Sequence, residues 1–117
     1  MTDLQQLRKG STGMLILSVL EDGKKHGYAI MRELEKRSQG YFSMTAALLY
    51  PTLHQMEQDG LVTSEWDQPP GQRKRKLYTI TPAGLERLAA DQSEWRQFFH
   101  YLFKSLEAPE TLKGEPE

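Results

Sequence analysis

The sequence has 117 residues, a formal net charge of −1, 38% hydrophobic and 26% charged residues, and no cysteine. This length suits one compact domain, and the absence of cysteine excludes a disulfide framework and thiolate metal sites. The longest apolar run, residues 14–17, is far shorter than the roughly 20 residues of a membrane span. The N-terminus also lacks the pattern of a signal peptide. We therefore expect a cytoplasmic protein with no membrane partner.

The charged residues are unevenly distributed along the chain. Residues 1–80 carry 11 Lys or Arg and 9 Asp or Glu, whereas residues 81–117 carry 4 and 7. The densest basic cluster is residues 73–76, four cations in a row. Because local potential attracts phosphate within a Debye length of about 8 Å, the small negative total does not exclude DNA as a partner.

Two helices are predicted in the N-terminal part. Apolar residues recur at steps of three, four and seven over residues 4–20, which indicates a helix. Gly10 and Gly13 weaken its first half by up to about 1 kcal/mol each, so we expect the firm part at residues 11–21. A second helix is predicted over residues 27–38. Its buried side is expected to contain Tyr28, Ile30, Met31 and Leu34.

The third helix lies within residues 43–59 and contains Pro51. Proline is favoured as a first helical residue, so the helix could start there. Alternatively, Ser43 or Thr45 caps an earlier start, and the helix tolerates a proline that costs about 3 kcal/mol in its interior. One helical face collects Leu49, Leu53 and Met56. This spacing favours a continuous helix.

A hairpin and a long helix follow. Residues 61–66 and 76–80 are rich in β-branched and aromatic residues, which predicts two strands. Residues 67–72 are a proline- and glycine-rich turn between them. Thr81 before Pro82 is a helix-start signal.

The order helix, helix, helix, hairpin, long helix is that of a winged helix-turn-helix protein, a mainly α fold with a small β-hairpin. We expect residues 1–81 to form a winged helix-turn-helix DNA-binding domain. Residues 82–107 would form a C-terminal dimerisation helix, and residues 108–117 a disordered tail.

The face of the third helix opposite its apolar side is small or polar and uncharged. Such a face can enter the major groove, where Gln, His and small apolar groups meet base edges. The start of the helix also offers free N–H groups to phosphate. An ordinary solvated surface is the other interpretation. The DNA contacts predicted on this helix are Thr45, Ala47, Pro51, His54 and Gln55.

The cation run at residues 73–76 supplies a second candidate DNA contact. Four neighbouring cations repel one another, and a polyanion relieves that repulsion. Strand alternation directs Arg73 and Arg75 to one face, and Lys74 and Lys76 to the other. We predict salt-dependent DNA contacts from Arg73, Lys74 and Arg75. The alternative is that these cations only protect an edge strand from aggregation.

The last helix carries a heptad-like apolar seam with further aromatic residues beside it. An exposed apolar surface of this kind marks an interface, and a two-fold dimer covers it most simply. Such a dimer would place two recognition helices about one DNA turn apart. The alternative is packing within the monomer. The predicted interface residues are Leu7, Leu85, Gln92, Trp95, Phe98, Leu102 and Leu106.

Signatures of an enzyme are missing from the sequence. The histidines, His26, His54 and His100, lack the spacing of metal ligands, and there is no phosphate-binding glycine loop or nucleophile elbow. We therefore expect no catalytic activity, no cofactor and no metal.

Three segments together resemble the PadR family of transcriptional regulators. They are the LYPTL element of residues 49–53 with its continuation to residue 62, KHGYAI at residues 25–30, and RKLYTITPAG at residues 75–84. The resemblance implies a winged-helix homodimer, usually a repressor, that binds a palindromic operator. It also implies that the recognition helix continues through Pro51 and that Tyr50 contacts the DNA backbone.

The single long C-terminal helix resembles the short subgroup of that family, which includes multidrug-sensing repressors. In that subgroup, paired tryptophans at the dimer centre stack on flat aromatic ligands, and Trp95 occupies the matching place. Phe99 stands where some drug-binding members carry an acidic residue, so a preference for cationic drugs is not implied. A pocket filled by its own aromatic side chains is the alternative. The implied effector site consists of Met14, Ser18, Leu88, Trp95 and Phe99.

The leading functional hypothesis is an effector-responsive repressor. A small hydrophobic or aromatic ligand between the last helices would favour a dimer whose half-site spacing no longer fits the operator. The second hypothesis is a protein–protein interaction module without an effector, in which the wing only adds solubility.

Overall fold

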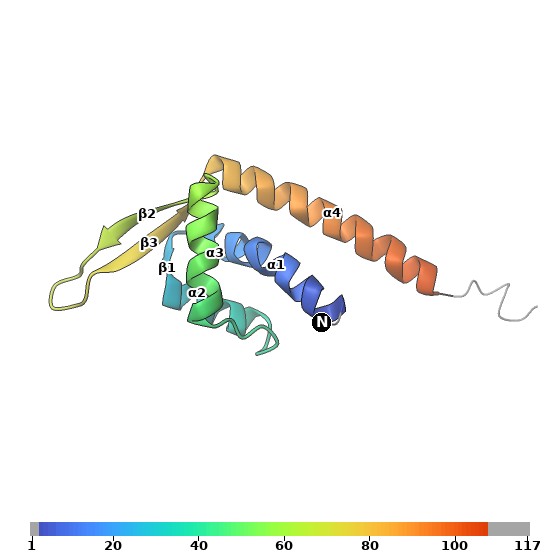
Figure 1. The fold of residues 1–117 in the computed structure, drawn as a ribbon, viewed down its shortest axis with the longest axis horizontal. Helices are drawn as coiled ribbons and strands as arrows, with labels where there is room; N and C mark the ends of the chain where they lie inside the picture. Colours follow the sequence, from blue (N-terminus) through green and yellow to red (C-terminus); the bar gives the residue numbers. More distant parts are fainter. Residues whose placement is uncertain (1–2, 108–117) are drawn as a thin grey trace, which may run out of the picture.

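The computed structural model describes residues 3–107 and has the element order expected of a winged helix (Figure 1). The fold is mainly helical with a small antiparallel sheet, which confirms the predicted class. The predicted tail at residues 108–117 lies outside the described residues. The elements are α1 (Asp3–Leu20), β1 (Lys25–His26), α2 (Gly27–Arg37), α3 (Ala46–Gln58), β2 (Val62–Asp67), β3 (Arg75–Ile80) and α4 (Pro82–Leu106).

The sheet has three strands in the order β1-β3-β2, all antiparallel. Strands β2 and β3 form the hairpin, called the wing below, with Asp67 opposite Arg75 at its outer end. The two-residue strand β1 was not predicted. It pairs His26 with Leu77 and is too short to show alternation, so only its pairing with β3 defines it.

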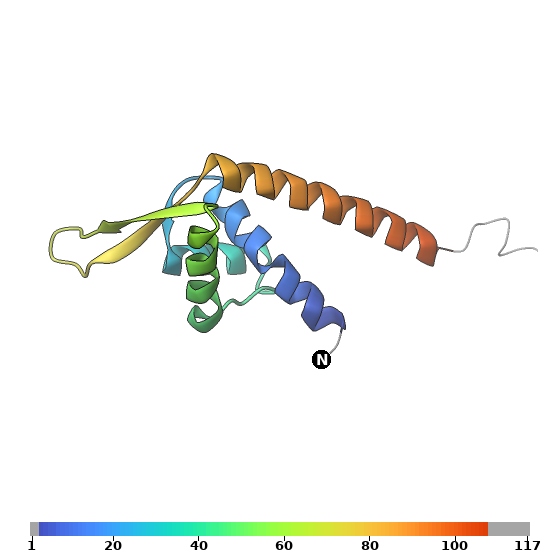
Figure 2. The ribbon, with the colours of Figure 1, turned by 45° about the horizontal axis from the view of Figure 1, so that its top comes forward.

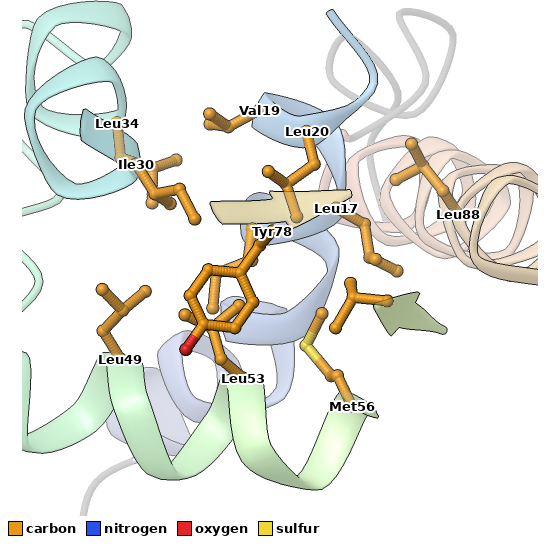
Figure 3. Close-up of a cluster of buried hydrophobic side chains, with 12 residues drawn as sticks. Leu17, Val19, Leu20, Ile30, Leu34, Leu49, Leu53, Met56, Tyr78 and Leu88 are labelled. Carbon is orange, nitrogen blue, oxygen red and sulfur yellow. The ribbon is translucent and has the colours of Figure 1, made fainter. Parts of the chain in front are cut away.

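One hydrophobic core lies where α1, α2, α3 and the base of the wing meet (Figure 3). Each buried aliphatic side chain contributes about 1.5–3 kcal/mol to folding. Tyr78 directs its ring from β3 toward α3, so the wing is anchored in the same core as α3. The core residues are Ile16, Leu17, Val19, Leu20, Ile30, Leu34, Leu49, Leu53, Met56, Val62, Tyr78 and Leu88.

Helix α1 is continuous from Asp3 to Leu20, which confirms the helix predicted over residues 4–20 and includes the half that Gly10 and Gly13 were expected to weaken. The glycine positions explain this. A Cβ on Gly10 would lie 3.8 Å from Trp95 Cζ2, and one on Gly13 would lie 3.8 Å from Met56 Sδ. Both glycines therefore lie where α1 packs against other elements, and tertiary contacts offset their low helix propensity.

Helix α2 buries Ile30 and Leu34, whereas Tyr28 is 63% exposed. The prediction that Tyr28 faces the core was wrong, because Tyr28 precedes Ile30 by two residues, or about 200° around the helix. Near the end of α2, Arg37 pairs with Glu33 of the same helix and with Asp22. The hydrogen bond from Arg37 holds the pKa of Glu33 below its usual value.

Helix α3 begins at Ala46 behind Thr45, whose Oγ1 accepts the Leu48 N–H at 3.3 Å. Of the alternatives, the earlier start is therefore confirmed, and the helix runs through Pro51. Pro51 has no N–H for the carbonyl of Ala47, but Ala47 is exposed, so water can reach that carbonyl. Gly60, at φ +78°, terminates the helix as predicted.

Helix α4 begins at the base of the wing and leaves the core. Thr81 Oγ1 accepts the Gly84 N–H at 3.0 Å and donates to the Gly60 carbonyl at 2.7 Å, which confirms the predicted cap. Leu88 enters the core. Beyond it, α4 extends away on the side opposite the wing (Figures 1 and 2). No helix in residues 3–107 has the length and apolar character needed to cross a membrane.

Candidate nucleic-acid interface

The outer face of α3 is open to solvent. Its apolar side, Leu49, Leu53 and Met56, is buried in the core as predicted. The opposite side exposes Thr45, Ala47, Tyr50, Pro51, His54 and Gln55. This face carries hydroxyl, imidazole, amide and small apolar groups but no formal charge, the set that meets base edges in a major groove.

Two pairs of polar side chains contact each other on this exposed face of α3. The Gln58 amide contacts His54 Nε2 at 3.3 Å, and Gln55 Nε2 donates to Asp59 Oδ1 at 3.1 Å. Both pairs are four residues apart along the helix. These contacts orient the imidazole and amide groups on the exposed face of α3.

The wing exposes Arg73, Lys74 and Arg75 at its outer end. Trp66, which is 60% exposed, lies opposite Lys76 in the hairpin register. Lys74 Nζ and Lys76 Nζ lie 4.9 and 5.4 Å from the centre of its ring. Strand alternation predicted that these two lysines share a face, and their common contact with Trp66 confirms it. Cation–π attraction to tryptophan holds both ammonium groups in place.

A groove of about 350 Å³ lies between the wing, α3 and the start of α2. It brings Tyr50 of α3 together with Lys74 and Arg75 of the wing, three residues that were predicted to contact DNA. The other lining residues were not predicted to contact DNA. The pairing of Trp66 with Lys76 across the hairpin could have indicated two of them. The lining residues are His26, Gly27, Tyr28, Tyr50, Trp66, Lys74, Arg75, Lys76 and Tyr78.

Tyr50 is 43% exposed and lies directly against Gly27. Below it, Tyr78 is buried in the core, and this burial raises the pKa of the Tyr78 phenol above its usual value, with a smaller contribution from Tyr50. The groove therefore combines the phenols of Tyr50 and Tyr78 with the wing cations Lys74, Arg75 and Lys76. Phosphate oxygens accept hydrogen bonds from such donors and are attracted by such positive charge.

Residues 3–107 contain no group of three His, Cys, Asp or Glu side chains able to hold a metal ion. The groove offers cations, phenols and an indole. This arrangement can bind a polyanion.

Comparison with known proteins identifies the family of this chain. The model of the transcriptional regulator PadR-like family matches residues 16–90. The chain belongs to this family. The matched residues include α2, α3 and the wing, so all elements of the groove lie within the family domain. PadR-like proteins are transcriptional regulators and not enzymes.

Individual relatives of this PadR-like chain cover most of its length. The transcriptional regulator Rv3488 of Mycobacterium tuberculosis is 33% identical over 89 residues, which are 76% of this chain and 79% of that protein. A PadR family transcriptional regulator from Eggerthella lenta has a similar structure, with a TM-score of 0.79 and 33% identity, over 90% of this chain and 89% of that chain.

The structure of Bacillus subtilis PadR in complex with operator DNA is also similar. The TM-score is 0.61 with 24% identity, over 67% of this chain and 44% of that chain. This likeness shows a shared fold.

A second groove, of about 450 Å³, lies between α1 and α4 of this PadR-like chain. It brings together Met14, Ser18, Trp95 and Phe99, four of the five residues of the implied effector site. The fifth, Leu88, is 1% exposed and belongs to the core, so the structure does not bring it to the groove. The additional lining residues are Leu15, Gln92 and Arg96.

The seam along α4 is uncovered in the single chain. Leu106 is 69% exposed, and Leu7, Leu85 and Phe98 are exposed as well. Gln92, Trp95 and Leu102 are half-buried. An aromatic ladder continues along the helix, with ring centres of Trp95 and Phe99 5.4 Å apart and those of Phe99 and Phe103 6.2 Å apart.

Proposed function

We propose that this PadR-like regulator acts in the cytoplasm as a homodimeric repressor that binds a palindromic operator. The observation that carries the proposal is the groove, where Tyr50 of α3 meets Lys74, Arg75 and Lys76 of the wing. Base edges would be read by the outer face of α3, and phosphates would be held by the groove and the wing. The similar fold of Bacillus subtilis PadR, solved with operator DNA, supports this assignment.

A homodimer would form through the uncovered face of α4 together with the start of α1. Beyond Leu88, the described part of α4 has no buried residue, although it carries several large apolar side chains. Pairing of two copies would remove this surface from water at about 25 cal/mol per Å². It would also hold the two recognition helices at a set separation, as a palindrome requires.

The effector would bind in the groove between α1 and α4, where Trp95 and Phe99 offer ring faces to a flat aromatic ligand. Arg96 lines the same groove, and no carboxylate lines it. The ligand would therefore be neutral or acidic rather than cationic. Binding there would change how α4 lies on α1, and so the spacing of the recognition helices.

A titration of salt against DNA binding tests the proposed function. Genomic fragments retained by the purified protein would be sequenced, and the best fragment would be titrated in a gel shift. Repressor-type binding predicts a preferred palindromic fragment and a steep loss of affinity as salt rises. Absent or salt-insensitive binding would instead favour a protein–protein interaction module, in which the wing contacts a protein.

A further inference from the structure

His26 lies at a junction of three elements. It is the second residue of β1 and the residue before α2, yet its side chain does not cap that helix. Instead the ring lies toward the wing and is 19% exposed. Nδ1 is 3.0 Å from the Lys76 carbonyl oxygen on β3, and Nε2 is 3.1 Å from Asp67 Oδ2 on β2.

Both groups that face the ring accept hydrogen bonds. A backbone carbonyl has no hydrogen, and an ionised carboxylate has none either. A neutral imidazole carries hydrogen on one nitrogen only, so it could satisfy one of these contacts and would place a lone pair against the other. The two contacts form together only when both ring nitrogens carry hydrogen.

We infer that His26 is an imidazolium that fixes the wing to the start of α2, so that DNA affinity falls as pH rises and His26 loses its proton. This inference rests on the proposed DNA-binding function. His26 is a positioning residue: its ring crosses β3 and joins β2 through Asp67. The same groove holds Tyr50 and the lysines that contact Trp66, so a shift of the wing changes how these groups meet phosphates.

The neighbouring charges define the expected pH range. Besides Asp67, the titratable or charged groups that line the same groove as His26 are Tyr28, Tyr50, Tyr78, Lys74, Arg75 and Lys76. Tyrosine, lysine and arginine ordinarily titrate at about pH 10 or above, so near neutral pH only the histidine changes its charge. If DNA affinity depends on the protonated bridge, then by linkage bound DNA strengthens that bridge in turn.

Asp67→Asn separates protonation from the contact itself. An asparagine amide can donate to the lone pair of Nε2 while Nδ1–H still donates to the Lys76 carbonyl. The neutral ring then satisfies both partners, and the bridge persists without the extra proton. Asp22→Asn is the matched control, because it removes the same charge from an exposed ion pair with Arg37.

The decisive experiment measures the affinity for one DNA fragment at about pH 6 and about pH 8, at constant salt, for the native chain and both variants. We expect the native chain and Asp22→Asn to bind roughly three- to tenfold more weakly at the higher pH. Asp67→Asn should keep only the part of this difference that comes from His54 on α3, because His54 is present in all three proteins. Equal pH dependence in the native chain and Asp67→Asn would overturn the inference.

Nitrogen NMR of the imidazole rings gives a readout that needs no DNA. At about pH 7 the native His26 should show hydrogen on both nitrogens, whereas in Asp67→Asn it should show the neutral Nδ1–H form. A neutral His26 in the native chain would overturn the inference even if DNA binds well. The imidazolium pattern in a chain that binds no DNA would support the protonated bridge and contradict the proposed function instead.

Discussion

The phenol of Tyr50 occupies the space that a side chain at position 27 would need. A Cβ on Gly27 would lie 2.5 Å from Tyr50 Oη and 2.7 Å from its Cε1. Tyr50 belongs to α3, and Gly27 is the first residue of α2. The glycine therefore lets the recognition helix and the start of α2 approach closely, and it determines where the Tyr50 hydroxyl lies in the groove.

Gly27→Ala should reduce DNA affinity without unfolding the protein. The added methyl meets the far end of a flexible, partly exposed side chain, so Tyr50 can rotate away at little cost, and alanine favours the helix. The displaced hydroxyl should lose its phosphate contact and weaken binding about tenfold. Fluorescence anisotropy with labelled DNA measures the affinity, and thermal unfolding checks the fold. Native affinity in both Gly27→Ala and Tyr50→Phe would show that Tyr50 does not contact DNA.

Two other glycines should respond in opposite directions. A Cβ on Gly84 would collide with the backbone carbonyl oxygen of Leu61, which cannot move away as a side chain can. Gly84→Ala should therefore lower the free energy of unfolding by about 2 kcal/mol. Gly13→Ala is the matched control, since its Cβ makes an ordinary contact with Met56 and should stabilise α1 by about 0.5–1 kcal/mol. Urea unfolding at equal protein concentration measures both; changes of the same sign would contradict this packing.

Local signals in the sequence were sufficient to predict most of the helices and strands. Thr45 and Thr81 are cap residues whose hydroxyls bond the helix starts that they precede, so those boundaries could be predicted. Tertiary contacts decided the rest. Gly10 reads as a helix-weakening residue, yet it lies against Trp95 from a helix far along the chain. Strand β1 likewise exists only through its pairing with β3.

The candidate DNA site was partly predictable for the same reason. The outer face of α3 follows from helical periodicity, and the wing cations follow from composition. The sequence does not show that His26 reaches Asp67 across β3, because that contact depends on the order of strands in the sheet. Tyr28 was assigned to the core by its apolar character, whereas its position on the helix directs it into the groove.

Trp95 should report ligand binding between α1 and α4. The chain has two tryptophans, so Trp66→Phe leaves Trp95 as the only indole emitter. Planar aromatics of equal ring size with an acidic, neutral or cationic substituent would be titrated into this variant. We expect quenching by the acidic and neutral compounds and weaker binding of the cationic one, because Arg96 lines the groove. Emission that no compound changes would contradict an effector site at Trp95.

The most direct test of the DNA interface is the dependence of affinity on salt. Arg73→Gln/Arg75→Gln removes two wing cations, and Lys9→Gln/Lys104→Gln removes two cations from the start of α1 and the end of α4. If the wing contacts DNA, the slope of log affinity against log salt should become shallower by about 0.9 for each lost phosphate contact. The control variant should keep the native slope. The same slope in all three proteins would contradict the assignment of this surface to DNA.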